Sequence, residues 1–332
     1  MAIPFAINGL GRIGRALARI AAGRSDLELV AANDSAPPES IARLLRHDTV
    51  HGAFPVSVAA TGDALRLGDR RVPLFHGARP AEIPWESTAA RIVIESTGRF
   101  RARPAAAGHL RGPVERVIVS AVADGVDATF CYGINHRDFD PSRHRVVSNA
   151  SCTTNCLAAM ALVLERSFGV ERALMNTVHC VTNSQNLVDM AHPDPRRARA
   201  AFANIIPTTS DAIPSIGLVL PALAGRIEGL AMRVPVTAGS LVDLTVSLAR
   251  TVERSAVVAA FREAAADDLA GILGVVDEEL VSSDFIGDPH SAVIDLPLVQ
   301  QVDSRLFRIV AWYDNEWGYS NRLADLVAFL AA

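Results

Sequence analysis

Lysine is absent from this chain, and all 32 of its basic residues are arginine. The side-chain amine needed for Schiff-base chemistry is therefore missing, and a bound anion must be held by arginine, hydroxyl or backbone N–H groups. With 36 acidic residues the formal net charge is −4, so the chain lacks the basic surplus typical of nucleic-acid-binding proteins. No apolar run reaches the roughly 18 residues that a membrane-spanning helix requires. We expect neither nucleic acid nor a membrane among the partners.

Cysteine is also scarce, with four residues at positions 131, 152, 156 and 180. Their spacing is unlike that of a zinc ribbon, and we expect no metal site. The first residues, Met1–Phe5, lack the positive charge and the long apolar stretch of a secretion signal, so we expect a cytoplasmic protein with reduced thiols. A chain of 332 residues with 50% hydrophobic content can bury the cores of about two domains.

Short apolar runs alternate with helix-like patterns through the first 148 residues. We expect strands at residues 3–7, 27–32, 92–95, 117–120 and 146–148, and a helix at 13–22. Such alternation predicts a parallel sheet with crossover helices. We therefore assign residues 1–150 to a first α/β domain.

The pattern changes after residue 150. Residues 182–199 are polar and show little periodicity, runs at 230–235, 241–248 and 306–312 are typical of strands, and 254–269 and 316–330 are typical of amphipathic helices. The run at 241–248 partly alternates apolar and polar residues, as burial of one sheet face requires. The sequence predicts a second, α+β domain at residues 151–315 with a mostly antiparallel sheet.

A glycine-rich turn lies between the first predicted strand and the first predicted helix. Gly9, Gly11 and Gly14 form the pattern G-x-G-x-x-G, which allows a tight turn and a close approach of a pyrophosphate to the helix N-terminus. The next strand ends at Asp34, whose carboxylate can bind the hydroxyls of an adenosine ribose. A glycine turn in an ordinary strand–helix unit is the alternative. The combined spacing favours a dinucleotide-binding site.

The most distinctive stretch is Ser148–Cys156, which has the sequence SNASCTTNC. Cys152 should lie where a strand is followed by a helix that Thr153 and Thr154 open. Unpaired backbone N–H groups and the helix dipole favour a thiolate there. Cysteine is often a small buried apolar residue, but the flanking hydroxyl residues argue against an apolar pocket. We interpret Cys152 as a nucleophile and expect Cys156 to point into the core.

A nucleophilic cysteine beside a dinucleotide indicates aldehyde oxidation through a thioester, which also needs a base. His179 ends the apolar run Thr177–His179 and should lie at a strand end, where sites of this architecture gather. Other histidines, at positions 47, 51, 136, 144 and 192, occupy turn-like or helix-edge contexts. His179 is therefore the candidate base, with a structural histidine as the alternative.

Together these and further motifs resemble those of phosphorylating glyceraldehyde-3-phosphate dehydrogenases. The resemblance runs in order over essentially the whole chain, and SNASCTTNC is its most diagnostic segment. The other matching segments are Asn8–Gly14, Thr177–His179, Arg196–Ala201, Asn204–Pro207, Arg233–Pro235 and Trp312–Tyr319. The resemblance implies a Rossmann domain completed by a C-terminal helix at 316–332, and a catalytic domain with an S-shaped loop at 181–206. It also implies a homotetramer in which this loop packs near a neighbour's cofactor.

The resemblance assigns roles to the matching residues. Cys152 corresponds to the nucleophile and His179 to the base that activates it. Thr182 and Arg233 correspond to the site of the substrate's terminal phosphate. The inorganic-phosphate site corresponds to Ser151, Thr153, Arg197 and Ser210. Asn315 corresponds to the residue that fixes the nicotinamide carboxamide, and Tyr319 to a ring near the nicotinamide. The expected cofactor-binding residues are Gly9, Gly11, Arg12, Ile13, Gly14, Asp34, Ser96, Thr97, Ser120, Asn315 and Tyr319.

Some positions depart from the family pattern. Asp211 follows Ser210 where many members have glycine, so a carboxylate would weaken phosphate binding unless it turns away or pairs with an arginine. Pro214 replaces a usual lysine, Ser184 a usual aspartate, and Cys180 a small residue. Ser35 and Ala191 stand where strict NAD enzymes usually carry leucine and proline. We expect NAD as cofactor because Asp34 opposes a 2′-phosphate, with NADP as a second cofactor.

The resemblance implies oxidation of glyceraldehyde 3-phosphate to 1,3-bisphosphoglycerate with inorganic phosphate and NAD. Two alternatives stay open. Erythrose-4-phosphate dehydrogenases, in which water usually resolves the thioester, resemble this chain at residues 192–194 and 288–292. A dinucleotide-binding sensor or interaction protein without turnover is the alternative from another class, although Cys152 and His179 are both present.

Overall fold

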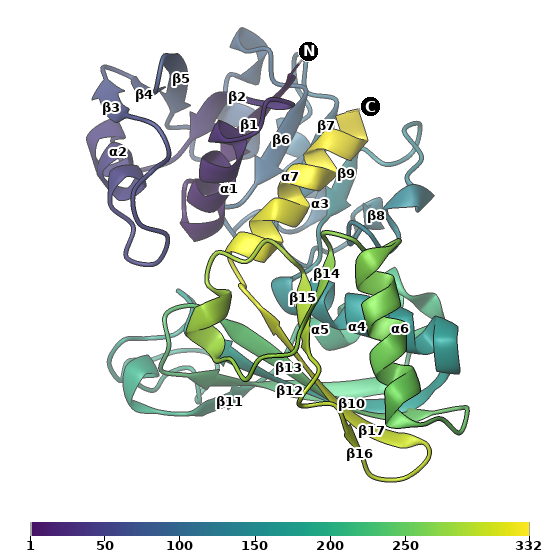
Figure 1. The fold of residues 1–332 in the computed structure, drawn as a ribbon. Helices are drawn as coiled ribbons and strands as arrows, with labels where there is room; N and C mark the ends of the chain where they lie inside the picture. Colours follow the sequence, from purple (N-terminus) through teal and green to yellow (C-terminus); the bar gives the residue numbers. More distant parts are fainter. Residues whose placement is uncertain (1, 332) are drawn as a thin grey trace. The chain divides into compact units, whose positions relative to one another are not determined.

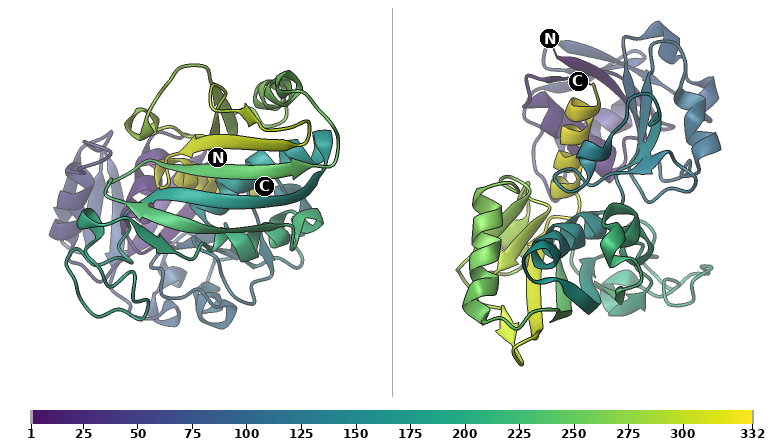
Figure 2. Two further views of the ribbon diagram at one scale, coloured as in Figure 1. Left: turned by 90° about the horizontal axis from the view of Figure 1, so that it is seen from below. Right: turned by 90° about the vertical axis from the view of Figure 1, so that its right-hand side faces the viewer.

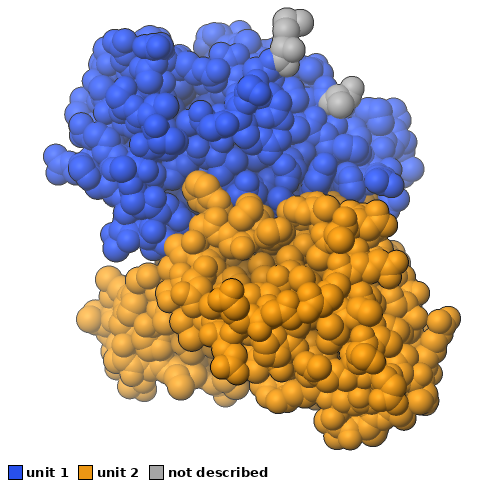
Figure 3. Space-filling view, viewed as in Figure 1, with its two compact units in different colours: residues 1–132, 136–150, 319–332 blue, residues 133–135, 151–318 orange. Residues whose placement is uncertain are grey.

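The computed structural model describes residues 2–331, which form two compact units (Figure 3). The first unit runs to Tyr132 and adds His136–Ala150 and the chain from Tyr319 onward. The second unit comprises Gly133–Asn135 and Ser151–Gly318. This division differs from the expected domains at residues 133–135 and at residues 316–318, which group with the second unit.

The first unit is built on a mostly parallel sheet (Figure 1). Its strands lie in the order β3-β4-β5-β2-β1-β6-β7-β9-β8. All neighbours are parallel except β3–β4 and β4–β5. The strands are β1 (Ile3–Asn8), β2 (Leu27–Asn33), β3 (Val58–Thr61), β4 (Ala64–Leu67), β5 (Arg70–Phe75), β6 (Ile92–Glu95), β7 (Arg116–Val119), β8 (Ala128–Thr129) and β9 (Val146–Ser148).

Helices cover this sheet because strands buried on both faces need apolar partners on each side. They are α1 (Arg12–Ala22), α2 (Pro38–Arg46), α3 (Arg103–Ala106) and α7 (Trp317–Ala331). From Tyr319 on, α7 returns to the first unit, where Leu323, Leu326 and Leu330 are buried. An ion pair between Arg24 and Asp325 (2.6 Å) also fixes this helix.

The second unit contains a mostly antiparallel sheet in the order β11-β12-β10-β13-β17-β15-β14, with β16 paired to β17. Two of its pairs, β10–β12 and β14–β15, are parallel. Helices α4, α5 and α6 pack against it, and the left view of Figure 2 looks onto the broad face of its long strands. The elements are α4 (Cys152–Phe168), β10 (Val170–Cys180), β11 (Ile206–Thr208), α5 (Ala212–Val219), β12 (Ile227–Val234), β13 (Ser240–Leu248), α6 (Arg254–Ala266), β14 (Leu273–Val276), β15 (Ala292–Asp295), β16 (Gln300–Gln301) and β17 (Leu306–Tyr313).

Short 3-10 turns complete the chain at Pro80–Glu82, Trp85–Ser87, Ala107–His109, His136–Asp138, Ala201–Ala203, Pro221–Leu223 and Ser282–Phe285. The predicted fold class is confirmed: a parallel α/β unit is followed by an α+β unit with a mostly antiparallel sheet. The antiparallel ribbon β3–β5 was not predicted. Across residues 2–331 no helix has both the length and the apolar character needed to cross a bilayer.

Candidate active site

The glycine-rich turn has the geometry of a phosphate cradle. Gly9 has φ +97°, a conformation that favours glycine. A Cβ on Gly14 would lie 2.0 Å from the carbonyl oxygen of Gly9, so no larger residue fits there. A Cβ on Gly11, the residue that precedes α1, would meet no described atom within 4 Å. The turn is therefore tight on one side and open at the helix N-terminus, which suits a pyrophosphate.

Asp34, directly after β2, is held beside this turn. One carboxylate oxygen accepts a hydrogen bond from the backbone N–H of Leu10 (2.7 Å), and the other accepts one from Ala36 (2.9 Å). Arg12, another predicted cofactor residue, pairs with Asp48 (2.5 Å). Burial of Asp48 opposes ionisation, but hydrogen bonds from the backbone of His51 and Val50 and the Arg12 ion pair lower its pKa to about 2.

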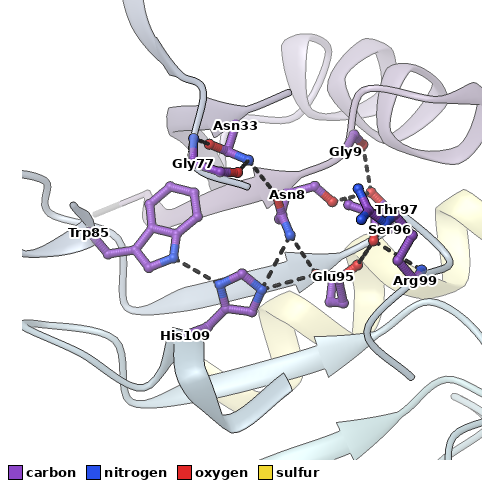
Figure 4. Close-up of polar contacts among 10 residues, drawn as sticks. All are labelled: Asn8, Gly9, Asn33, Gly77, Trp85, Glu95, Ser96, Thr97, Arg99 and His109. Carbon is purple, nitrogen blue, oxygen red and sulfur yellow. Dashed lines mark hydrogen bonds and ion pairs between the residues drawn. The ribbon is translucent and has the colours of Figure 1, made fainter. Parts of the chain in front are cut away.

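A buried polar network lies behind the turn (Figure 4). The carboxylate of Glu95 accepts hydrogen bonds from the Asn8 amide (2.5 Å) and from Nε2 of His109 (3.0 Å). Nδ1 of His109 accepts from the indole N–H of Trp85 (2.9 Å), so the ring hydrogen that bonds Glu95 is on Nε2. Asn33 donates to the Asn8 amide oxygen (2.8 Å). Each of these side chains is at least nine-tenths buried.

The same network fixes the loop after β6. The second Glu95 oxygen accepts from the backbone N–H of Thr97 (2.9 Å) and from its hydroxyl (2.5 Å). The hydroxyl of Ser96 donates to the carbonyl of Gly9 (2.7 Å) and so joins this loop to the glycine turn (Figure 4). Ser120, which follows β7, donates its backbone N–H to the carbonyl of Glu95 (2.9 Å). The structure thus connects Gly9, Ser96, Thr97 and Ser120, four of the predicted cofactor residues, to Glu95 and its neighbours.

Cys152 and His179 lie together in the second unit. Ser151 caps α4, because its hydroxyl oxygen accepts from the N–H of Thr154 (3.0 Å), and Cys152 is the first residue of that helix. Sγ of Cys152 is 3.5 Å from Nε2 of His179, which lies near the end of β10 and is 3% exposed. Arg233 on β12 reaches the other ring nitrogen, with Nη1 2.5 Å from Nδ1 of His179.

The protonation of this pair differs from the sequence-based expectation. We expected the helix N-terminus to favour a thiolate, but burial raises the pKa of the Cys152 thiol, although Arg233 and a hydrogen bond from Thr153 act in the opposite direction. Burial, together with the positive charge of Arg233, lowers the pKa of His179 to about 3. Burial therefore opposes the thiolate that the helix N-terminus is expected to favour, and it keeps the imidazole of His179 neutral at neutral pH.

Tyr313 joins the two catalytic segments, a role that the sequence did not suggest. Its buried hydroxyl lies 2.9 Å from the hydroxyl of Thr153 and 2.9 Å from that of Thr177. Thr177 in turn donates to the carbonyl of Leu241 (2.9 Å). Thr153 follows Cys152 and Thr177 lies two residues before His179, so Tyr313 fixes the nucleophile and the base relative to each other.

Asn315 is held by an unpredicted partner, Cys180. The Cys180 thiol donates to the side-chain oxygen of Asn315 (3.1 Å), and the hydroxyl of Ser240 lies 3.4 Å from the same oxygen. In the first unit, the hydroxyl of Tyr319 donates to the carbonyl of Ala150 (3.2 Å), whose φ of +54° is strained for a residue with a Cβ.

The predicted anion residues form two groups on adjacent segments. In the first, Thr182 follows β10, its hydroxyl is 2.9 Å from that of Ser184, and His179 and Arg233 are register partners on β10 and β12. In the second, Arg197 donates to the hydroxyl of Thr208 (2.8 Å) and lies 3.4 Å from Asp194.

Ser210 and Asp211 follow this second group. The hydroxyl of Ser210 accepts from the N–H of Ala212 (3.3 Å) at the start of α5. Asp211 is exposed, and no ion pair to it occurs among residues 2–331. Of the two conditions under which Asp211 would not weaken phosphate binding, pairing with an arginine is therefore not met in the described structure. Among residues 2–331, no three His, Cys, Asp or Glu side chains are grouped so that they could hold a metal ion.

A glycine-rich dinucleotide turn and a cysteine–histidine pair are characteristic of dehydrogenases that act through a cysteine nucleophile. Two family models match the chain, glyceraldehyde 3-phosphate dehydrogenase, NAD binding domain, over residues 3–103 and glyceraldehyde 3-phosphate dehydrogenase, C-terminal domain, over residues 151–315. The chain is 48% identical to a glyceraldehyde-3-phosphate dehydrogenase of Kitasatospora aureofaciens over 328 residues (98% of each chain). It is 47% identical to glyceraldehyde-3-phosphate dehydrogenase 2 of Streptomyces arenae, and 45% identical to glyceraldehyde-3-phosphate dehydrogenase 2 of Bacillus subtilis. These two matches cover the whole of this chain and 99% and 98% of the relatives. The chain belongs to the glyceraldehyde-3-phosphate dehydrogenase family.

Proposed function

We propose that this protein oxidises glyceraldehyde 3-phosphate to 1,3-bisphosphoglycerate with NAD and inorganic phosphate. The observation that carries the proposal is the 3.5 Å contact between Cys152 at the start of α4 and His179 at the end of β10. A nucleophile within reach of a base is the arrangement that covalent catalysis requires. The names of its relatives favour glyceraldehyde 3-phosphate as the substrate.

Cys152 and His179 take part in each step of the proposed reaction. Sγ of Cys152 forms a bond to the aldehyde carbon while its proton passes to Nε2 of His179, and His179 gives this proton to the aldehyde oxygen, so that a hemithioacetal forms and the imidazole is neutral again. His179 then takes the hydroxyl proton of this hemithioacetal as the carbon gives up its hydride. Bound NAD supplies the acceptor for that hydride. An oxygen of inorganic phosphate attacks the resulting thioester, the carbon–sulfur bond breaks, and the thiolate of Cys152 leaves with the electron pair.

The first unit provides groups that fit NAD. The open N-terminus of α1 beyond Gly11 would hold the pyrophosphate, and the fixed carboxylate of Asp34 would bind the ribose hydroxyls. The same carboxylate disfavours a 2′-phosphate, but Ser35 and Ala191 leave NADP as a second cofactor. We assign the nicotinamide carboxamide to Asn315, whose amide is fixed by Cys180.

Arginine and hydroxyl groups would bind both anions, since the chain has no lysine. We assign the terminal phosphate of the substrate to Thr182 and Arg233. We assign the binding of inorganic phosphate to Arg197, Ser210, Ser151 and Thr153. In the described structure Arg197 contacts the hydroxyl of Thr208 and the carboxylate of Asp194, and these groups have to share the guanidinium with the incoming anion.

We also propose a homotetramer. Large apolar side chains are exposed in the loop after β10 and on the open face of the second sheet, where a second copy of the chain would cover them. They are Leu187, Val188, Met190, Phe202 and Ile205 in the loop, and Leu174 and Leu230 on the sheet. Sedimentation of the wild type and of a Leu187→Asp, Val188→Asp variant tests this, and a monomeric wild type would contradict it. The cytoplasmic location stays a prediction.

Initial rates decide between this function and erythrose-4-phosphate oxidation. NAD reduction should be measured with glyceraldehyde 3-phosphate and with erythrose 4-phosphate, each with and without inorganic phosphate. We expect the higher kcat/KM with glyceraldehyde 3-phosphate and a strict need for phosphate. A phosphate-independent rate, highest with erythrose 4-phosphate, would replace our proposal, and the exposed carboxylate of Asp211 is the feature that favours this second function. Absence of turnover with both aldehydes would indicate the non-catalytic alternative.

A further inference from the structure

The side-chain amide of Asn315 is held at its oxygen and left open at its nitrogen. Asn315 lies between β17 and α7 and is 6% exposed. Its Oδ1 accepts hydrogen bonds from Sγ of Cys180 (3.1 Å), the last residue of β10, and from Oγ of Ser240 (3.4 Å), the first residue of β13. Nδ2 of the amide has no hydrogen-bond partner among residues 2–331. Both hydrogens on Nδ2 are therefore left for a ligand.

Cys180 and Ser240 each present a hydrogen to this oxygen. Burial raises the pKa of the Cys180 thiol to about 12, so the sulfur keeps its hydrogen at neutral pH. Oγ of Ser240 accepts from the backbone N–H of Cys180 (3.2 Å), and its own hydrogen is left for Asn315. If the amide turned over, its NH2 group would replace the oxygen and both of these bonds would be lost. The two donors therefore favour one orientation of the amide.

The backbone on either side of Asn315 is fixed as well. Oδ1 of the buried Asp314 accepts hydrogen bonds from the N–H groups of Glu316 (2.9 Å) and Trp317 (2.9 Å). Its Oδ2 accepts one from the N–H of Gly287 (2.8 Å). Because the backbone is held on both sides, the freedom that remains to Asn315 is rotation of its side chain. The orientation of the amide thus depends on the two donors at its oxygen.

We infer that Cys180, with Ser240, is a positioning residue that sets the orientation of the Asn315 amide, so that this site selects a nicotinamide substituent with a hydrogen-bond acceptor. The inference rests on the proposed function, in which Asn315 binds the carboxamide of NAD. That carboxamide has a donor and an acceptor, and it can turn to suit either orientation of Asn315. A substituent with only an acceptor or only a donor cannot adapt in this way. Such substituents therefore report the orientation of the amide.

Two analogues of NAD test the inference by binding, without turnover. In 3-acetylpyridine adenine dinucleotide the ring carries a carbonyl, an acceptor, and in 3-aminopyridine adenine dinucleotide it carries an amino group, a donor. Calorimetric titration gives both dissociation constants, and their ratio cancels any general effect of a variant on dinucleotide binding. Rates are a poorer readout, since Sγ of Cys180 also lies 3.7 Å from Nδ1 of His179. We expect the wild type to bind the acetyl analogue about tenfold more tightly, as one gained hydrogen bond allows.

Variants at the two donors separate orientation from packing. Cys180→Ala combined with Ser240→Ala removes both donors and lets the amide turn to suit either analogue, so the ratio should fall by about fivefold. Cys180→Ser restores a donor and should keep the wild-type ratio. Cys156→Ala, which truncates another buried cysteine of the second unit, is the matched control and should also leave the ratio unchanged. Asn315→Ala should abolish the discrimination.

The inference is wrong if the double variant keeps the wild-type ratio, or if Cys180→Ser lowers it as much as alanine does. The single variant Cys180→Ala serves if the double variant does not fold, and a ratio that falls by less than about twofold would then overturn the inference. A wild type that binds the amino analogue as tightly as the acetyl analogue would overturn it too. Failure of the proposed function is distinguishable, because it appears as absent NAD reduction with glyceraldehyde 3-phosphate, whereas the binding ratio is measured without aldehyde.

Discussion

Replacing His109 by alanine should destabilise the first unit strongly and loosen the cofactor turn. The imidazole lies between two buried groups, the indole N–H of Trp85 and the carboxylate of Glu95. Without the ring, the Trp85 donor is left unsatisfied, which costs about 1–3 kcal/mol. Glu95 loses one of its charge-assisted bonds, worth about 1.5–3 kcal/mol. The sum predicts a loss of about 2.5–6 kcal/mol in the free energy of unfolding.

The effect should extend to cofactor binding. Glu95 also holds the backbone and hydroxyl of Thr97, and the neighbouring Ser96 bonds the carbonyl of Gly9. A carboxylate that shifts after loss of His109 would therefore disturb the glycine turn. We expect the dissociation constant for NAD to rise by about tenfold, which corresponds to about 1.4 kcal/mol.

Urea unfolding followed by fluorescence, at a fixed protein concentration, measures the stability change. His109→Gln is the matched control because an amide supplies both a donor and an acceptor, and it should retain most of the stability. In a double-mutant cycle with Trp85→Phe, the combined loss should be about 1–3 kcal/mol smaller than the sum of the single losses, since no orphaned N–H remains. Additive losses, or equal effects of alanine and glutamine, would refute the reasoning.

Four further predictions concern the active site. Cys152→Ser should abolish NAD reduction while NAD still binds in a fluorescence titration, because a serine hydroxyl ionises far less readily than a thiol; residual turnover would exclude the covalent route. His179→Asn should lower kcat by about 10² to 10⁴, the usual effect of a positioned base, and an unchanged kcat would remove it from the mechanism. Asp34→Gly should strengthen NADP binding relative to NAD binding, as measured by the two dissociation constants. A wild type that already binds NADP more tightly than NAD would show that Asp34 does not determine the cofactor preference. Asp211→Asn should lower KM for inorganic phosphate about fivefold with KM for the aldehyde unchanged, as expected for about 1 kcal/mol at 4 Å in water; equal KM values would show that the exposed carboxylate faces away.

The sequence determined the features that depend on a few neighbouring residues. The glycine spacing around Gly9 and Gly14 predicts a turn whose conformation only those residues allow, and the structure has it. Thr153 and Thr154 predict the start of a helix, and α4 begins at Cys152, one residue earlier than we predicted. His179 could be placed at a strand end because apolar runs and their ends are local patterns.

The tertiary structure alone decided what surrounds these residues. Arg233 meets His179 across 54 residues of chain because β12 pairs with β10 in one particular register. Tyr313 and the Trp85–His109–Glu95 network depend likewise on strands and turns that are distant in sequence. Burial of Cys152 raises the pKa of its thiol, and this effect depends on the packing of every neighbouring element and not on local sequence. Sequence predicts the nucleophile and the base, but their degree of burial and the contact of Arg233 with His179 follow from nonlocal packing.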